Sequence, residues 1–459
     1  MSYFTILRQR FLSATGVVSL LLLVRGFGQP VDSPAGKGTI DPFRIERGQL
    51  IVPAGTYLVA GKPVQVAAEA RLRIRPTDIV QVEAEETLLS KKKPEGFFSG
   101  TMLRGPKTGS IGAFGSLIPG SLVIKDAAGQ RLIEMEDYLV STPFALIGIG
   151  PRSRVTPATK VYASYAYYTQ RIDSVVVDRS GAVSVVEGQA QLYSPPIPAA
   201  PVGSVTIANV YRPFRGTELT AGDVFPIKAS AVQVATATRG GLIPRTMAKI
   251  AAGKPVKVVC WGDSITVGGD VKPEEAWANR LQVELRARFP QAQLTFANHS
   301  IGGTKSAQWL ANGNYPGLPK QNAEKCRFDL VLEEKPDLVV MEFLNDVVFP
   351  EDVLASTYAA IHEELNRRGI EWIIVTPSLK IPDNYDLAEM KDETPRLLDL
   401  FLLRFASSHG YPVADAAARW RHFHREGTPF FALFNNAYNH PNALGHGLFV
   451  DEILKCFTP

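Results

Sequence analysis

Residues 256–266 read VKVVCWGDSIT, and this stretch decides the fold of the second half of the chain. The run 256–260, apolar except for Lys257, is typical of a buried strand. Gly262-Asp263-Ser264 follows it directly, and residues 273–289 then repeat apolar side chains at helical spacing. Because a strand, a tight turn and a helix form the repeating unit of α/β domains, we expect a mainly parallel sheet here.

The same alternation continues to the end of the chain. Further strands are predicted at 294–297, 338–341 and 372–375, and further helices at 353–368, 394–408 and 448–457. We therefore assign residues 246–459 to one α/β domain. Sites in open sheets of this kind form at the C-terminal ends of strands, which is where the first three motifs described below fall.

The preceding residues change character and predict an all-β region that is sandwich-like or barrel-like. Short strand-like runs such as 49–53 and 57–60 alternate with turn signals, and 174–186 has the pattern of a hairpin. The proline-rich segment 194–201 is either a linker or a long connection inside the β region. We place a boundary here, between a β-rich domain at 30–195 and a β-rich continuation and linker at 196–245. Cross-strand or core packing is favoured over a sugar-stacking role for the aromatic cluster formed by Tyr162, Tyr165, Tyr167 and Tyr168.

Residues 1–28 have the layout of a secretory signal or an N-terminal anchor. Arg8 and Arg10 precede a mostly apolar run at 11–24, and small or turn-forming residues follow. The run is shorter than the roughly 20 residues that span a bilayer, which favours the signal. We therefore expect a secreted, periplasmic or cell-surface protein with no stable membrane span after processing.

Composition narrows the range of partners. The formal net charge is only +4 over 459 residues, and the basic residues are scattered, which argues against nucleic acid. Neither a metal-ligand cluster nor a dinucleotide-binding glycine motif is present, so we expect chemistry without a metal or organic cofactor. The three cysteines lack metal-type spacing; Cys260 is expected in the core, and a bridge between Cys326 and Cys456 stays open.

Ser264 is the candidate nucleophile because it directly follows the first strand of the α/β domain. A hydroxyl needs a base within hydrogen-bond reach and donors for the oxyanion that it generates. His440, in a loop ahead of the final predicted helix, is the preferred base; His446, as a capping or supporting group, and His299 are the alternatives. The candidate oxyanion donors are the Ser264 amide, Gly303 and the Asn345 side chain, each lying just past a predicted strand.

These blocks together resemble the SGNH family, also called GDSL-type esterases and lipases. Gly-Asp-Ser at 262–264, Asn-x-x-x-Gly-Gly at 298–303, Asn345-Asp346 and His-Pro-Asn at 440–442 occur in the family's order. The resemblance covers residues 255–459. It implies a flavodoxin-like three-layer fold, with Ser264 as nucleophile, Gly303 and Asn345 as oxyanion donors, and His440 as base.

Two positions depart from the family pattern. Phe343 stands where the family usually has glycine, so we expect an altered pocket wall there. Ala437 stands at the usual position of the acid, three residues before His440. We therefore predict a Ser264–His440 dyad with an unidentified orienting group, either a main-chain carbonyl or a side chain, and a lower rate than a full triad would give. The candidate side chains are Asn435, Asn436, Asn439 and Asp451.

The leading functional hypothesis is an exported carboxylic-ester hydrolase that removes acetyl or short acyl groups from a polysaccharide through an acyl-enzyme. The first alternative keeps the chemistry but has lipids or aryl esters as substrates. The second alternative is a non-catalytic surface or glycan-binding protein with a degenerate hydrolase domain, supported only by Ala437 and Phe343.

Overall fold

The computed structural model describes all residues except 1–42, 215–217, 228–242, 382–393, 424–425 and 458–459. The predicted export signal at 1–28 and part of the predicted linker lie outside the described residues. No described helix is long and apolar enough to cross a membrane.

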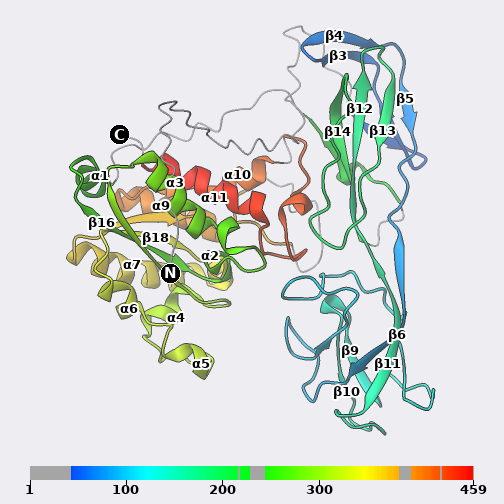
Figure 1. Cartoon of the computed structure of the whole chain (residues 1–459), viewed down its shortest axis with the longest axis horizontal. Coiled ribbons are helices and arrows are strands. Elements are labelled where there is room, and N and C mark those ends of the chain that lie inside the picture. Colours follow the sequence, from blue (N-terminus) through cyan, green and yellow to red (C-terminus); the bar gives the residue numbers. More distant parts are fainter. Residues whose placement is uncertain (1–42, 215–217, 228–242, 382–393, 424–425, 458–459) are drawn as a thin grey trace, which may run out of the picture.

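The C-terminal half is built on a five-stranded parallel sheet, as the alternating pattern predicts (Figure 1). Its strands, in the spatial order β17-β16-β18-β19-β20, are β17 (Gln293–Ser300), β16 (Pro255–Gly262), β18 (Leu338–Glu342), β19 (Glu371–Val375) and β20 (Val413–Ala414). Every neighbouring pair is parallel. The four predicted strands are confirmed. The fifth, β20, was not predicted because two residues are too few to show a hydrophobic period.

Helices cover both faces of this sheet and make three layers. The described helices are α1 (Pro244–Ala251), α2 (Ser264–Val267), α3 (Trp277–Arg288), α4 (Ser306–Leu310), α5 (Lys320–Ala323), α6 (Phe328–Glu333), α7 (Glu351–Arg367), α9 (Leu397–His409), α10 (Ala416–His422) and α11 (Ala443–Lys455), with short 3₁₀ turns at Pro273–Glu275, Leu344–Val348 and Phe430–Leu433. Successive side chains of β16 alternate between the faces. Val258 and Cys260 pack with α1, α3 and α11, whereas Val259 and Trp261 pack with α6, α7 and α9.

The last helix begins five residues earlier than predicted. Asn442 caps α11, because its side-chain oxygen accepts hydrogen bonds from the main-chain N–H groups of Leu444 and Gly445. Gly445 lowers the apparent helix propensity, but a Cβ there would lie 2.8 Å from both Pro441 and Trp420. Close packing therefore requires glycine at this position. Because glycine has a low helix propensity, the first turn of the helix was not predicted from the sequence.

The N-terminal half contains two antiparallel β modules (Figure 1). The first, which we call the N-terminal β module, contains β1 (Arg44–Glu46), β2 (Gln49–Val52), β3 (Gly55–Val59), β4 (Lys62–Val66), β5 (Ala70–Leu72), β12 (Arg171–Asp178), β13 (Val183–Val186), β14 (Ser204–Arg212) and β15 (Val224–Pro226). The second, which we call the inserted β module, contains β6 (Ile79–Leu88), β7 (Thr101–Met102), β8 (Val123–Lys125), β9 (Tyr138–Ser141), β10 (Leu146–Ile149) and β11 (Lys160–Tyr168). Two short 3₁₀ turns lie at Thr142–Phe144 and Ala221–Asp223.

The division between these modules differs from the predicted boundary near residue 195. Strands β12 and β14 pair along eight residue positions of one sheet, in the order β13-β12-β14-β15. The proline-rich segment 194–201 is thus a connection inside that sheet. Separate hydrophobic cores instead mark residues 79–168 as an insertion between β5 and β12. Within the insertion, Tyr165 on β11 is buried and its hydroxyl donates to Glu85, in agreement with a packing role.

A shared apolar core joins both modules to the α/β domain. Ile111 and Phe144 of the inserted module and Tyr211 of the N-terminal module belong to one buried cluster with Phe431 and Tyr438. The ring of Tyr211 stacks on that of Phe431 at 4.0 Å between centroids. The β modules therefore pack directly against the segment of the α/β domain that carries His440.

Candidate active site

The C-terminal ends of β16, β17 and β18 bring three of the sequence blocks to one edge of the sheet. Gly262 ends β16, and a Cβ there would lie 2.2 Å from the main-chain oxygen of Glu342 in β18. Asp263 then caps α2 by accepting a hydrogen bond from Ile265 N–H, which makes Ser264 the first residue of this helix. The Ser264 amide therefore lies at a helix N-terminus, where N–H groups favour negative charge.

Ser264, His440 and Asp270 form a continuous series of hydrogen bonds. The Nε2 atom of His440 lies 2.9 Å from Ser264 Oγ, and its Nδ1 atom lies 2.6 Å from Asp270 Oδ2. The side chains of His440 and Asp270 are only 13% and 5% exposed, so water competes little for the ion pair. A nucleophile, a base and an acid that orients the base have this arrangement in serine hydrolases.

Asp270 was not predicted from the sequence. The side chains that were predicted to orient His440 make other contacts or are exposed. Asn436 Oδ1 accepts hydrogen bonds from the main-chain N–H groups of Tyr438, Asn439 and His440, so it holds the histidine loop in shape. Asn435 donates to the main-chain oxygen of Asp270. Asp451 is exposed on α11. The group that orients His440, left unidentified from the sequence, is therefore Asp270 in this geometry, and it is not among the four candidate side chains.

Two glycines let Asp270 approach His440 from the nucleophile's own loop. Gly268 ends α2 in the left-handed conformation, at φ 84°. A Cβ on Gly269 would lie 2.8 Å from His440 Cε1, so only glycine leaves room for the imidazole ring. Asp270 itself has φ 67°, a region that aspartate and asparagine tolerate better than most side chains. Gly268-Gly269-Asp270 is thus the one sequence signal that could have pointed to the acid.

The surroundings of Asp270 favour its charged form. Burial alone raises the pKa of this carboxyl, but hydrogen bonds from His440 and Ser110 and the charge of His440 outweigh burial. The pKa of Asp270 therefore lies below its ordinary value, so that the group is an anion at neutral pH. A negative charge beside Nδ1 favours the tautomer in which Nε2 is free to accept the Ser264 proton.

The other predicted oxyanion donors lie beside Ser264. A Cβ on Gly302 would be 3.6 Å from Ser264 Cβ, which places the 302–303 turn against the nucleophile. Gly303 has φ 76° and is exposed. Asn345 Nδ2 donates to Asp263 Oδ2 at 2.8 Å and to the Thr304 main-chain oxygen at 3.2 Å. To donate a hydrogen bond to an oxyanion, the Asn345 amide has to give up the longer of these two bonds, the one to Thr304.

Three buried carboxyls brace the loops beneath the site. Asp263 accepts hydrogen bonds from Ile265, from the main chain of Asn345 and from its side chain, while Asp346 accepts from Ser306 and Tyr358. Burial raises the pKa of Asp263 to about 6 and that of Asp346 to about 7. Burial and the charge of Asp263 also raise the pKa of Glu342 well above its ordinary value.

Phe343, at the position where an altered pocket wall was expected, lies in the core of the domain. Its side chain is 2% exposed and packs edge-on against Trp261 at 5.4 Å, inside the core of the domain. A side chain at this position therefore fills space below the sheet edge and leaves the surface around Ser264 to other residues.

The two alternative histidines lie elsewhere. His446 is buried within α11, accepts a hydrogen bond from Trp277 N–H at Nδ1, and has its pKa lowered to about 3, first of all by burial. A base that stays neutral in the core suits a structural role, in keeping with its predicted supporting function. His299 lies on β17 and pairs with Glu334, which directly follows α6.

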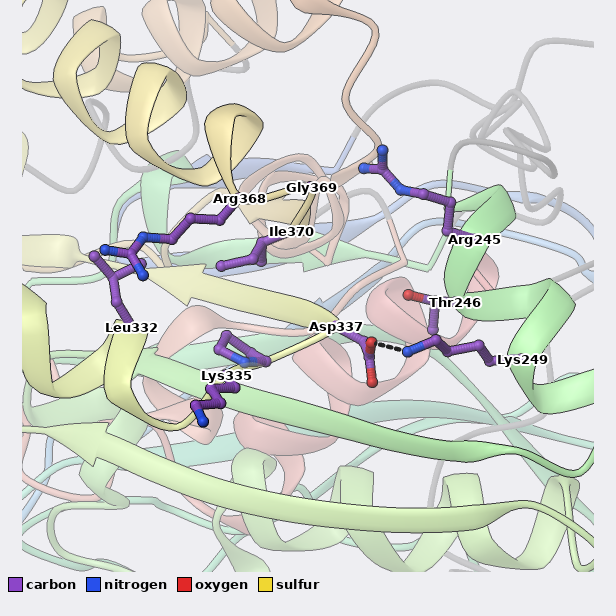
Figure 2. Close-up of a pocket in the computed structure, with 10 residues that line it drawn as sticks. Arg245, Thr246, Lys249, Leu332, Lys335, Asp337, Arg368, Gly369 and Ile370 are labelled. Atoms are coloured by element: carbon purple, nitrogen blue, oxygen red, sulfur yellow. Dashed lines mark hydrogen bonds and ion pairs between the residues drawn. The ribbon is translucent and has the colours of Figure 1, made fainter.

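A cleft at the opposite edge of the sheet is separate from this chemistry. It is lined by Arg245, Thr246, Lys249, Leu332, Lys335, Pro336, Asp337, Arg368, Gly369 and Ile370 (Figure 2). Asp337 and Ile370 directly precede β18 and β19, whereas Ser264 follows the far end of β16. Among the described residues, no group of three or more His, Cys, Asp or Glu side chains could hold a metal ion.

Solved structures that resemble this chain include esterases and a lipolytic protein. A two-domain esterase (CEX) active on acetylated mannans is 22% identical, with a TM-score of 0.35, and the match covers 46% of this chain and 51% of that chain. The acetyl xylan esterase AlAXEase is 20% identical, with a TM-score of 0.34 and coverage of 43% and 98%. A lipolytic protein of the G-D-S-L family from Veillonella parvula is 19% identical, with a TM-score of 0.32 and coverage of 44% and 98%.

This chain thus matches about half the length of the two-domain esterase. At these identities and TM-scores, the likenesses identify no substrate. No curated protein sequence matches the chain. Residues 260–448 match the model of the GDSL-like Lipase/Acylhydrolase family, so the C-terminal half of this chain contains a GDSL-like lipase/acylhydrolase domain.

Proposed function

We propose that the chain is an exported serine esterase that removes acetyl or other short acyl groups from a polysaccharide. The observation that carries the catalytic part is the series Ser264 Oγ, His440 Nε2, His440 Nδ1 and Asp270 Oδ2, with contacts of 2.9 and 2.6 Å. The hydroxyl has a base in reach, and the base has a buried anion beside it.

In the first half of the reaction, His440 Nε2 takes the Ser264 proton as Oγ attacks the ester carbonyl carbon. The Ser264 amide, the Gly303 amide and the Asn345 side-chain amide stabilise the resulting oxyanion. When the intermediate collapses, the bond between the acyl carbon and the sugar oxygen breaks, and His440 gives its proton to that departing oxygen, which leaves as a hydroxyl group. Asp270 stabilises the imidazolium present between these steps.

In the second half, water attacks the acyl-Ser264 ester while His440 takes one of its protons. Collapse of this second intermediate releases the carboxylic acid and returns the proton to Ser264 Oγ. The two halves consume one ester and one water and yield one alcohol and one acid, so that neither a metal nor an oxidant is required.

Separate observations support the choice of a carbohydrate ester and of export. Support for export is the pattern of residues 1–28, and support for a large substrate is the pair of β modules packed beside the histidine loop. Lipid or aryl esters are the competing substrates. The non-catalytic alternative rested on Ala437 and Phe343; Asp270 now fills the acid's role in the proposal, and Phe343 packs in the core.

The test compares hydrolysis of acetylated xylan with that of nitrophenyl esters of rising acyl length, for the wild type and Ser264→Ala. We expect acetate release from the polymer, a preference for the shortest nitrophenyl esters, and loss of both activities in the variant. A preference for long acyl chains would contradict the carbohydrate assignment while leaving the serine chemistry in place.

A further inference from the structure

A loop of the inserted β module touches the acid beside the catalytic histidine. Ser110 Oγ donates a hydrogen bond to Asp270 Oδ2 at 2.7 Å. The same oxygen lies 2.6 Å from His440 Nδ1. One carboxylate oxygen therefore binds both the imidazole and a hydroxyl that comes from a different module of the chain.

The approach of this loop is close enough to restrict the residue beside Ser110. A Cβ on Gly109 would lie 2.4 Å from Asp270 Oδ1 and 3.0 Å from its Cγ. The absence of a side chain at 109 thus allows the main chain to pack against the carboxylate. The loop thus contacts both oxygens of Asp270, with Ser110 beside Oδ2 and Gly109 beside Oδ1.

The loop is also held in place from two sides. Within the loop, Thr108 donates to the Ile111 main-chain oxygen through both its amide and its hydroxyl, at 2.8 and 2.6 Å. Beyond it, the Phe114 ring lies 5.2 Å from that of Phe144 and 5.1 Å from that of Tyr438, in the histidine loop. Ser110 is therefore carried by a braced turn whose far end packs against the segment that bears His440.

We propose that Ser110 is a positioning residue for Asp270, and that the inserted β module thereby completes the active site of the hydrolase domain. The hydroxyl holds Oδ2 toward Nδ1 and stabilises the carboxylate charge. A freely rotating or partly protonated carboxyl would stabilise the imidazolium less. This inference rests on the proposed serine chemistry. It adds that a residue of the inserted β module, 160 positions before Asp270 in the sequence, contributes to that chemistry.

The test uses full-length protein with Ser110→Ala, Ser110→Thr and the matched control Ser121→Ala. Ser121 belongs to the same module, and its hydroxyl bonds main-chain groups of Ile118 and Ala166. For a short nitrophenyl ester, we expect Ser110→Ala to lower kcat about 10-fold with little change in KM, since a hydrogen bond to a charged group is lost. The acid limb of its pH profile should move to higher pH, because Asp270 loses a donor to its charged form. Ser110→Thr should restore most of the rate, and Ser121→Ala should behave as wild type.

A second measurement does not depend on ester turnover. The proton of the His440 Nδ1–H···Asp270 hydrogen bond is followed by NMR in the wild type and in the same variants. We expect its downfield resonance to be retained in Ser110→Thr and Ser121→Ala, and to shift upfield or broaden in Ser110→Ala. If the wild type hydrolyses no ester, the proposed function fails, and this resonance still decides the role of Ser110.

Two results would overturn the inference. One is a Ser110→Ala protein with wild-type kcat, pH profile and resonance. The other is an equal loss of rate in Ser110→Ala, Ser110→Thr and Ser121→Ala, which would show a general structural effect instead of a donor to Asp270.

Discussion

Replacing Asp270 by asparagine removes the negative charge beside His440 while keeping the shape of the side chain. Asparagine also suits the backbone, because Asp270 lies at φ 67°, where asparagine is better tolerated than most residues. The turn after Gly269 should therefore persist, and a loss of rate in Asp270→Asn can be read as a loss of electrostatic and orienting function.

The expected size of the effect follows from the geometry. Asp270 Oδ2 lies 2.6 Å from Nδ1, and the carboxylate is 5% exposed. A pair of unit charges about 4 Å apart is worth about 4 kcal/mol at an effective dielectric of about 20. That energy corresponds to about a 1000-fold change in rate. An amide N–H facing Nδ1 also favours the tautomer with a proton on Nε2, which cannot accept the proton of Ser264.

We therefore expect kcat/KM of Asp270→Asn for a short nitrophenyl ester to fall by about 10²–10⁴-fold, with the melting temperature close to that of the wild type. Asp451→Asn is the matched control, because Asp451 is an exposed acid on α11 that was considered from sequence as a partner of His440. A fall of less than about 10-fold in Asp270→Asn, or an equal fall in Asp451→Asn, would refute the assignment of the acid.

Three further predictions concern stability, each measured by urea unfolding. Burial lowers the pKa of His446 from 6.5 to about 3, so between these pH values the unfolded chain binds a proton that the folded chain does not, and stability falls as pH drops. His446→Gln should remove up to about 1.4 kcal/mol of that loss per pH unit. An unchanged dependence of stability on pH between pH 6.5 and 5 would contradict this prediction. Burial and the charge of Asp263 raise the pKa of Glu342 and so favour its neutral form. Glu342→Gln should therefore change stability by less than about 1 kcal/mol, whereas a larger loss would indicate a required charge. Phe431→Ala should cost about 3–5 kcal/mol, because the ring is buried and stacked on Tyr211 across the module interface; a cost below about 1 kcal/mol would show that the interface contributes little.

The α/β domain was predictable because its strands and helices carry strong local patterns. Residues 338–341 are apolar throughout, and residues 256–260 are apolar except for Lys257, as expected of strands covered on both faces. Ser264 and His440 lie in short motifs of fixed spacing. In the structure, Ser264 Oγ lies 2.9 Å from His440 Nε2. The division of the β region was harder, because pairing of β12 with β14 across the proline-rich segment depends on contacts that no local pattern records.

The acid was missed for a related reason. Asp270 follows Ser264 by only six residues and meets His440 because Gly268 and Gly269 redirect the chain. The acid was expected near His440 in sequence or on the final helix, and Asp270 lies in neither segment. Ser110 could not have been found at all, because nothing in the sequence of the inserted module indicates which acid it faces. Contacts between modules are fixed by packing of the whole chain, and a single sequence shows only its local periods.

The measurement that tests the central claim most directly is labelling with a fluorophosphonate probe, which reacts with activated serine nucleophiles. The wild type should be labelled on Ser264, the label should be absent from Ser264→Ala, and labelling should be much slower in His440→Ala. A wild-type protein that is folded but unlabelled, or a Ser264→Ala protein that is labelled as fast as the wild type, would contradict the account.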